Sequence, residues 1–239
     1  MAAATHQSAD RPASGAGERR LVGELVRFDG VQRFAHWATA ALFLALIVTG
    51  AALYVPAVEV LVGRRPLVER VHVDAGLALA APLLVSLAGP WGRALRRDLG
   101  RLNRWSEDDR RWLRSALSAR RTASVPKGKF NAGQKLNAAF TGGVLLVMVL
   151  TGAVMHWPLY WPLSWRTGAT FVHDVVAYVF VLVVVAHVAM ALAHPAALRS
   201  MVTGRVGLGW ARRHAPLWLE ELEAAAGTPV AGRDQPGPG

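Results

Sequence analysis

The chain has 239 residues, 53% of them hydrophobic, and its 27 Lys and Arg against 16 Asp and Glu give a net charge of +11. It contains no cysteine, which excludes disulfides, thiolate zinc sites, Cys-ligated iron–sulfur clusters and covalently attached c-type haem within this sequence. Any redox centre held here must therefore use histidine. The apolar residues are concentrated in a few long runs between arginine-rich stretches, which indicates a membrane protein rather than one soluble domain.

Four apolar segments are long enough to cross about 30 Å of hydrocarbon, which takes roughly 20 helical residues. They cover residues 34–55, 71–89, 136–157 and 170–193. These segments predict an all-α integral membrane protein, a four-transmembrane-helix bundle over residues 25–223. Residues 1–24 and 224–239 are predicted to be disordered tails, and the first tail has no apolar core of a cleavable signal peptide.

The distribution of Lys and Arg predicts the orientation of the bundle. With four spans, both termini and the middle loop share one side. They carry 5 Lys and Arg up to Arg33, 13 from Arg93 to Lys135 and 5 from Arg199 onward, against 4 in the two other loops. The positive-inside rule then predicts a multi-pass protein of the bacterial inner membrane with both termini cytoplasmic. Topology explains the basicity, and no nucleic-acid-binding module accompanies it, so no nucleic-acid partner is predicted.

The middle loop contains RWSEDDRRWL, which predicts an amphipathic helix at the membrane surface. Trp105 and Trp112 would place their indoles at headgroup level, with Asp109 and the arginines on the polar side. Lipid contact is the favoured interpretation, and contact with a partner protein is the alternative.

Four histidines lie in or at the ends of the predicted spans, where an ionisable side chain is costly and marks a functional candidate. His36 opens the first span at the cytoplasmic face, and His72 opens the second at the outer face. The fourth span carries His173 at its start and His187 fourteen residues later, about 21 Å along the helix and on nearly the same side of it. Depth therefore pairs His36 with His187, and His72 with His173.

Two imidazoles at each of two depths predict two b-type haems stacked across the membrane, each iron held between two histidines. The alternative is that each histidine is a satisfied interior or interfacial residue. Gly50 and Gly76 would let a flat ring approach the backbone, with ordinary helix contact as an equal alternative. The other histidines are assigned to interfaces or solvent: His156 and His194 at span ends, His6 in the first tail and His214 in the C-terminal extension.

Five stretches carry a family resemblance: VRFDGVQRFAHW before the first span, RVHVDAG opening the second, DLGRLNRWSEDDRRWL in the middle loop, GKFNAGQKLN entering the third, and MVTGRVGLGWARRHAPLWLEE after the fourth. With the His173 to His187 spacing, they resemble the gamma (cytochrome b) subunit of membrane-bound formate dehydrogenase. The wider prokaryotic cytochrome b561 group includes the cytochrome b subunits of nickel–iron hydrogenases. One departure is His214-Ala215-Pro216, where the family often has two histidines before proline.

The resemblance implies that His36 and His187 hold an inner haem b, and His72 and His173 an outer one. Electrons would enter from a periplasmic iron–sulfur subunit attached to a catalytic formate dehydrogenase subunit. This chain, not itself catalytic for formate, would pass them to quinone. One alternative is the cytochrome b subunit of a nickel–iron hydrogenase or of another periplasmic oxidoreductase. A more remote alternative is a haem-free membrane anchor or small transporter.

A quinone site is predicted where the sequence KFNAGQK enters the third span. Asn131 and Gln134 offer amide donors for the quinone oxygens, Gly133 permits close backbone approach, and Lys135 would deliver protons. The resemblance places the family's quinone pocket at this turn. The alternative is that Asn131 only caps the third helix.

Overall fold

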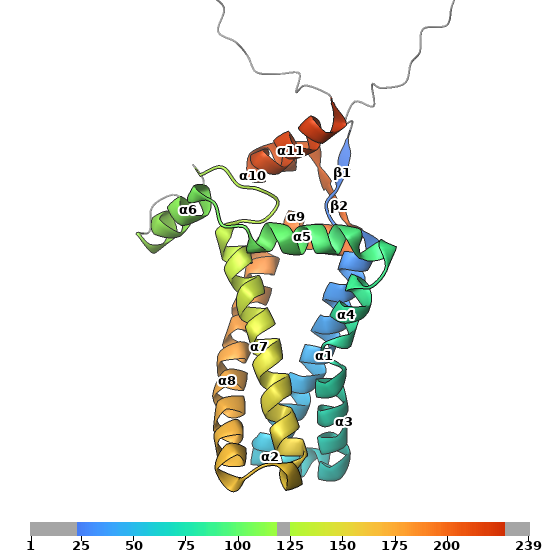
Figure 1. Ribbon diagram of the computed structural model, residues 1–239, viewed down its shortest axis with the longest axis vertical. Helices are drawn as coiled ribbons and strands as arrows, with labels where there is room; N and C mark the ends of the chain where they lie inside the picture. The colour runs from blue at the N-terminus through green and yellow to red at the C-terminus, as the bar shows by residue number, and fades with distance from the viewer. Residues whose placement is uncertain (1–22, 119–124, 228–239) are drawn as a thin grey trace, which may run out of the picture.

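The computed structural model describes residues 23–118 and 125–227, so the tail predictions for residues 1–22 and 228–239 lie outside the described residues. The chain forms an upright bundle with a smaller cap at the end where the described residues begin and finish (Figure 1). Four helical segments are long and apolar enough to cross a membrane: Gly30–Tyr54, Arg65–Leu87, Ala132–His156 and Leu163–Ala193. The four predicted long apolar helices are therefore confirmed, and the side on which the termini lie remains a prediction.

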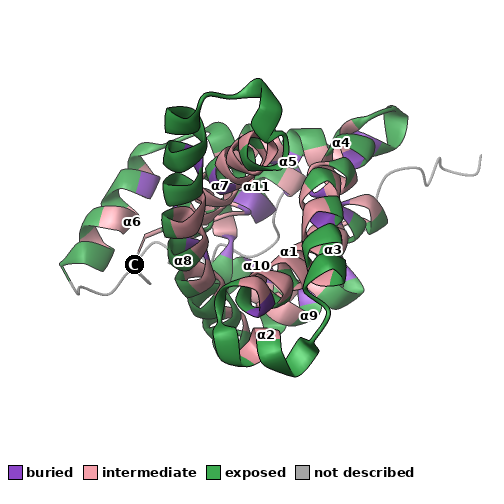
Figure 2. Cartoon of the chain, turned by 90° about the horizontal axis from the view of Figure 1, so that it is seen from below, coloured by how far each residue is buried: buried purple, intermediate pink, exposed green. Residues whose placement is uncertain are grey.

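Apolar side chains cover the outside of the bundle. Leu44, Leu146 and Leu182 are 64%, 59% and 70% exposed, and the outward faces of the helices are mostly exposed when viewed along the bundle (Figure 2). Proteins surrounded by water rarely expose continuous apolar surface of this kind. Because a helix satisfies its backbone hydrogen bonds internally, such a surface is suited to hydrocarbon.

Three of the spans are unbroken helices that begin before the predicted apolar runs. They are α1 (Gly30–Tyr54), α7 (Ala132–His156) and α8 (Leu163–Ala193). Asp29 caps α1 in a capping box with Gln32, so the helix begins four residues before the predicted span. Apolar runs report where hydrocarbon begins, whereas caps decide where the helix begins.

The second span differs from the single helix that was predicted. It consists of α3 (Arg65–Ala78) and α4 (Ala81–Leu87), with a break between them. Pro82 explains the break, because its ring lacks an N–H and clashes with the carbonyl four residues earlier, at Ala78.

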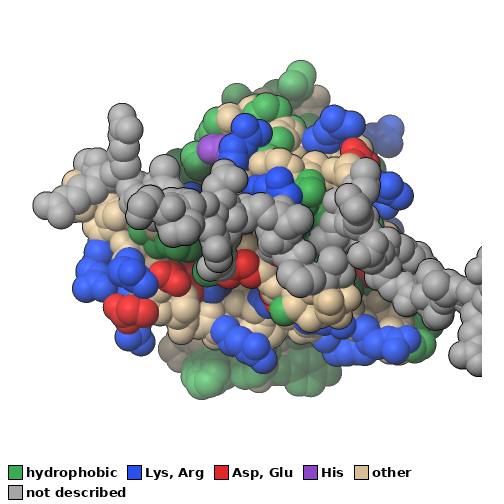
Figure 3. All heavy atoms as spheres, turned by 90° about the horizontal axis from the view of Figure 1, so that it is seen from above, with side chains coloured by type: hydrophobic (Ala, Val, Ile, Leu, Met, Phe, Trp, Pro, Cys, Tyr) green, Lys and Arg blue, Asp and Glu red, His purple; other side chains and the backbone are tan. Residues whose placement is uncertain are grey.

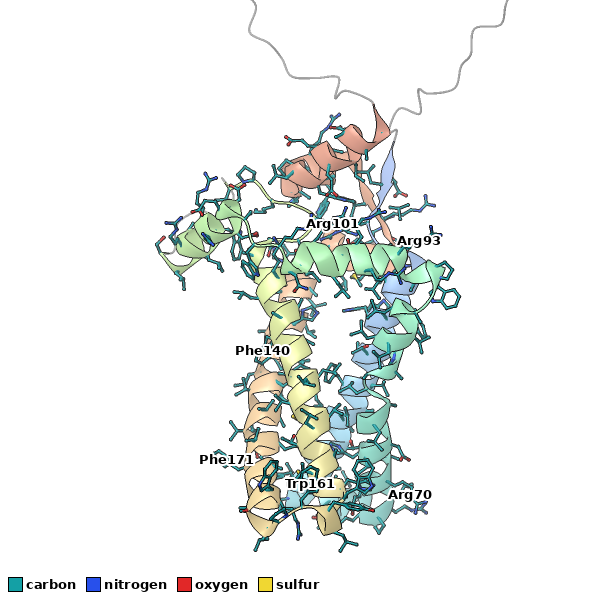
Figure 4. All side chains as sticks on the ribbon, in the orientation of Figure 1. Arg70, Arg93, Arg101, Phe140, Trp161 and Phe171 are labelled. Atoms are coloured by element: carbon teal, nitrogen blue, oxygen red, sulfur yellow. The ribbon has the colours of Figure 1, made fainter. Side chains whose placement is uncertain are left out.

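Short elements connect the spans at the end away from the termini, which we call the loop end. They are α2 (Pro56–Val62) and η3 (Pro158–Tyr160), and both begin with proline, whose fixed φ suits a first helical position. Figure 4 labels Arg70 and Trp161 at this end, and Arg93 and Arg101 at the opposite end.

The opposite end, the cap end, is built from the remaining elements. They are β1 (Glu24–Val26), η1 (Pro90–Gly92), α5 (Arg93–Asn103), α6 (Glu107–Leu117), α9 (Pro195–Thr203), β2 (Arg205–Gly207), α10 (Leu208–His214) and α11 (Pro216–Ala226). Helix α5 lies across the end of the bundle, with α10 and α11 above it (Figure 1). Lys and Arg side chains surround this face (Figure 3), as the charge distribution predicted.

A two-stranded antiparallel sheet joins the two ends of the described chain, and the sequence analysis did not predict it. Leu25 of β1 is opposite Val206 of β2, and both pack against Trp218 and Leu219 in a small apolar core. Gly204 (φ +82) makes the turn into β2, where a side chain would collide with the Phe28 carbonyl. Among the described residues, the regular elements thus run from β1, which begins at Glu24, to α11, which ends at Ala226.

Asp98 on α5 fastens the cap to the bundle. Its carboxylate is 3% exposed and accepts hydrogen bonds from Gln32 of α1 at 2.5 Å, from Arg101 at 2.6 Å and from the Lys129 ammonium. Arg101 also pairs with Glu221 of α11 at 2.6 Å. Burial lowers the pKa of Lys129, and the Asp98 charge opposes that shift. One carboxylate thus joins α1, α5 and the segment before α7.

A second cation lies next to this cluster. Arg27 is 4% exposed and donates to Ser200 at 3.2 Å and to the Lys129 carbonyl at 3.4 Å. Its guanidinium also lies 4.6 Å from the Trp210 ring. Burial lowers the pKa of Arg27 to about 10, with Asp98 acting in the opposite direction. The buried carboxylate of Asp98 therefore compensates more than one buried cation.

Replacing Asp98 with Asn should destabilise the protein by about 3 kcal/mol, because it leaves Lys129 buried without a counter-charge. Glu221→Gln is the matched control, since it removes the half-exposed partner of Arg101 and should cost about 0–1 kcal/mol. Thermal unfolding in one detergent measures both. Equal losses in the two variants would show that Asp98 does not fasten the cap.

Candidate functional site

The four predicted ligand histidines lie on three helices and form two pairs inside the bundle. His36 is near the start of α1, His72 is on α3, and His173 and His187 are both on α8. The ring centroids of His36 and His187 are 6.4 Å apart, and those of His72 and His173 are also 6.4 Å apart. The structure therefore brings together the two pairs that depth predicted, one towards the cap end and one towards the loop end.

The spacing within each pair suits one metal ion between two rings. An imidazole nitrogen binds a first-row metal at about 2 Å and lies about 1 Å from its ring centre, so two opposed ligands have ring centres about 6 Å apart. Both pairs match this value. Because α8 is continuous, the fourteen residues between its histidines separate the two pairs by about 21 Å along the helix. These residues fit two haem irons, each with two axial histidines.

A Thr-Gly dipeptide supports each histidine of the loop-end pair. Thr49 Oγ1 lies 2.8 Å from His72 Nδ1, and Thr151 Oγ1 lies 2.9 Å from His173 Nδ1. The following glycines, Gly50 and Gly152, face the same rings: a Cβ at either would lie 3.5 Å or 3.6 Å from the ring Cε1 atom. Both dipeptides are on the helix adjacent to the histidine that they support, Thr49-Gly50 on α1 and Thr151-Gly152 on α7.

The sequence analysis singled out Gly50 but missed Thr49, Thr151 and Gly152. The signal was present, since VTGA in the first span and LTGA in the third are near repeats. The sequence analysis also singled out Gly76. A Cβ added there would lie 3.8 Å from Leu46 Cδ2, so this glycine serves ordinary helix contact.

The cap-end pair has different surroundings. The His36 ring meets Trp37 edge-on at 5.2 Å, and within the described parts of the chain no hydrogen bond reaches a ring nitrogen of His36 or His187. Phe43 of α1 packs on Phe180 of α8, with ring centroids 4.4 Å apart. Phe180 is seven residues from each histidine of α8, so this aromatic contact lies between the two histidine pairs.

The other described histidines do not join either pair. His156 ends α7 and is exposed beside Trp157. His194 contacts the Met190 carbonyl through Nδ1 at 2.8 Å, and His214 contacts that of Trp210 at 3.1 Å. His6 lies outside the described residues.

The predicted quinone turn forms the N-terminus of α7. Asn131 Oδ1 accepts from the Gln134 backbone N–H at 2.9 Å, and Gln134 Oε1 accepts from that of Asn131 at 3.0 Å. Asn131 is thus the N-cap, which was the alternative interpretation. The cap uses only the two oxygens, and neither side-chain NH₂ group has a hydrogen bond to another described residue. The turn begins at the end of the bundle where α8 finishes (Figure 1).

Helix α6 docks on this turn through Gly133 and Lys135. A Cβ on Gly133 would lie 3.1 Å from Trp112 Cη2, so glycine permits the indole to pack there, a contact that the sequence analysis did not predict. The Trp112 Nε1 atom is buried and has no hydrogen-bond partner among the described residues. Lys135, the predicted proton donor, instead pairs with Asp109 at 2.6 Å and donates to the Arg104 carbonyl at 2.7 Å.

Asp109 is held ionised by these contacts. Burial acts to raise its pKa, but hydrogen bonds from Lys135 and Ser106 outweigh burial and bring the pKa below its usual range. Asp109 also closes the capping box of α6 with Ser106. The Lys135–Asp109 pair therefore fixes α6 against the start of α7.

Comparison with known proteins finds a matching family and several related proteins. A family model described as prokaryotic cytochrome b561 matches residues 27–204. The formate dehydrogenase cytochrome b556(fdo) subunit of Escherichia coli (strain K12) is 26% identical over 206 residues, which cover 83% of this chain and 93% of that protein. The nitrate-inducible cytochrome b556(Fdn) subunit of the same strain is 22% identical over 210 residues, covering 84% and 93%. The formate dehydrogenase cytochrome b556 subunit of Haemophilus influenzae is 23% identical over 208 residues, covering 82% and 83%.

Proposed function

This chain belongs to the prokaryotic cytochrome b561 family, and we propose that it is the di-haem subunit that carries electrons from a formate dehydrogenase to quinone. The family and the four apolar helices make it a membrane cytochrome b that binds haem b and transfers electrons. The number of haems, the partner, the quinone site and the orientation are the parts that we propose.

The observation that carries the proposal is the pair of 6.4 Å histidine separations at two depths. His36 and His187 would hold the cap-end haem, and His72 and His173 the loop-end haem. Each haem, when bound, supplies an iron that takes up and releases one electron. Three helices position these ligands, so the bundle determines both the depth of each site and the separation between them.

The three named relatives support formate dehydrogenase as the source of electrons, since each is a cytochrome b556 subunit of that enzyme. A chain without cysteine cannot hold a Cys-ligated iron–sulfur cluster, so another subunit must supply the relay. Under the positive-inside rule the loop end is periplasmic, and the donor would dock there beside His72 and His173. A nickel–iron hydrogenase is the second candidate source, because the family resemblance includes its cytochrome b subunits.

Quinone would bind at the cap end, at the turn that begins α7. The NH₂ groups of Asn131 and Gln134 are not used by the cap, and the buried Trp112 Nε1–H has no partner in the described parts of the chain. These donors suit the oxygens of a quinone. Protons taken up from the cytoplasm, while electrons arrive from the periplasm, would add to the proton-motive force. Because Lys135 is tied to Asp109, water at the turn is the better proton source.

Single histidine variants test the ligand pairs. His36→Ala and His187→Ala should each remove the cap-end haem and keep much of the loop-end haem, whereas His72→Ala and His173→Ala should do the reverse, because each variant deprives one iron of an axial ligand. Haem stoichiometry and the reduced α-band of the purified proteins measure this. His156→Ala is the control and should retain both haems. An unchanged haem content in any of the four variants eliminates that ligand, and loss of both haems in all four would refute the pairing.

Purification tests the partner. The tagged chain, extracted in mild detergent, should carry with it an iron–sulfur subunit and a formate-oxidising subunit, and formate should reduce its haems. A co-purified nickel–iron hydrogenase, with reduction by hydrogen instead, would support the second candidate. An isolated single polypeptide that oxidises a soluble donor at full rate would contradict both.

Two substitutions at Asn131 separate capping from quinone binding. Asn131→Asp keeps the oxygen that accepts from Gln134 but removes the amide donor. Quinone reduction should slow about tenfold, the equivalent of one lost hydrogen bond, while both haems remain reducible by the partner. Asn131→Ala, which loses the cap as well, should slow the reaction as much and also lower thermal stability. If Asn131→Asp turns over at the parental rate, Asn131 only caps α7.

A further inference from the structure

The two loop-end histidines are held in a way that the cap-end histidines are not. We propose that Thr49 and Thr151 fix the ring tautomers of His72 and His173 and thereby hold the loop-end haem at a lower reduction potential than these ligands would otherwise give. The proposal depends on the proposed ligation of haem by these histidines. It adds two positioning residues that contact the ligands rather than the iron.

The direction of each hydrogen bond follows from the number of protons on a hydroxyl group. Thr49 has one hydroxyl proton, and its oxygen lies 2.7 Å from the carbonyl of Ala45, one turn earlier on α1. A carbonyl can only accept, so the proton is used there. The hydroxyl oxygen must then accept at its 2.8 Å contact with His72 Nδ1, and Nδ1 carries the ring proton.

The same arrangement is found on α7. Thr151 donates to the Val147 carbonyl at 2.7 Å, which leaves its oxygen to accept from His173 Nδ1 at 2.9 Å. In a neutral imidazole, a proton on Nδ1 leaves Nε2 with a free lone pair. Both loop-end rings therefore present Nε2 as the metal ligand, already in the correct tautomer.

The hydroxyls also keep the rings in place before any metal binds. A threonine whose hydroxyl is bonded to its own helix has a fixed χ1 angle, so its oxygen lies at a defined position on the helix surface. The adjacent Gly50 and Gly152 leave room for the ring beside that oxygen, with ring carbons at contact distance from an added Cβ. The Thr-Gly dipeptide is thus a rigid support for an imidazole on the neighbouring helix.

A hydrogen bond from the distal ring nitrogen makes an imidazole a stronger donor to its metal. A stronger donor favours the more highly charged, oxidised iron and lowers the reduction potential, and hydrogen bonding beyond the ligands is one of the means by which proteins tune haem. Within the described residues, neither ring of the cap-end pair has such a bond. Transfer from the loop-end haem to the cap-end haem is therefore favoured, which is the direction that the proposed function requires.

Redox titration of the purified complex, followed by absorbance, tests this proposal because it resolves the two haems. Thr49→Val and Thr151→Val keep the shape of threonine but remove the acceptor, and each should raise the potential of the loop-end haem alone. The double variant should raise it further. Thr49→Ser and Thr151→Ser keep the hydroxyl and should stay near the parental potential. Thr170→Val is the matched control, since Thr170 donates to the Arg166 carbonyl on α8 at 3.0 Å and, among the described residues, has no hydrogen bond to either ring.

The outcomes separate this proposal from the ligand assignment. Loss of the loop-end haem in the valine variants but not in the serine variants would also support a role for the hydroxyl. Unchanged potentials in both valine variants, or an equal shift in Thr170→Val, would overturn it. A change in the EPR signal of the oxidised loop-end haem would report altered ring orientation, which a general loss of stability does not produce. If the histidine variants retain all haem, the proposed assignment of these histidines as haem ligands is wrong.

Discussion

One unbroken helix, α8, determines the arrangement of the whole site. It carries a histidine for each pair, and an α-helix has a set rise and rotation per residue, so the depth and direction of His173 and His187 are linked. The helix has no internal proline and ends before Pro195, which begins α9. Helices α1 and α3 then need to supply only one histidine each, at the matching depth. The proposed electron path thus depends on the straightness of a single element.

The cap end and the interior of the bundle are held by different interactions. Buried ions hold the cap end together, with Asp98 joining α1, α5 and the segment before α7. Such networks add little net stability compared with apolar packing, yet they select one arrangement of the elements that they join. Here that arrangement places α5 and α6 around the start of α7. Inside the bundle, Thr49 and Thr151 form hydrogen bonds with histidine rings on the neighbouring helices.

Much of this arrangement was predictable from the sequence, and the parts that were missed have different causes. The broken second span and the cap of α7 had local signals, Pro82 and Asn131, that are visible in the sequence. The β1–β2 pair did not, because strands of three residues have no periodicity and their pairing joins residues near opposite ends of the chain. The packing of Trp112 on Gly133 was missed since an indole in an amphipathic segment suits lipid and protein equally well.

The sequence by itself determined the four spans, the concentration of charge at one end and the fourteen-residue spacing on the fourth span. Each of these depends on local composition or on the geometry of one helix, and neither changes with the way the helices pack. Only the tertiary structure decided that Thr49 reaches His72, 23 residues away, and that Thr151 reaches His173, 22 residues away. Such contacts depend on how each helix is rotated about its own axis. In a bundle surrounded by apolar lipid, where hydrophobic faces look alike, packing between neighbouring helices sets that rotation.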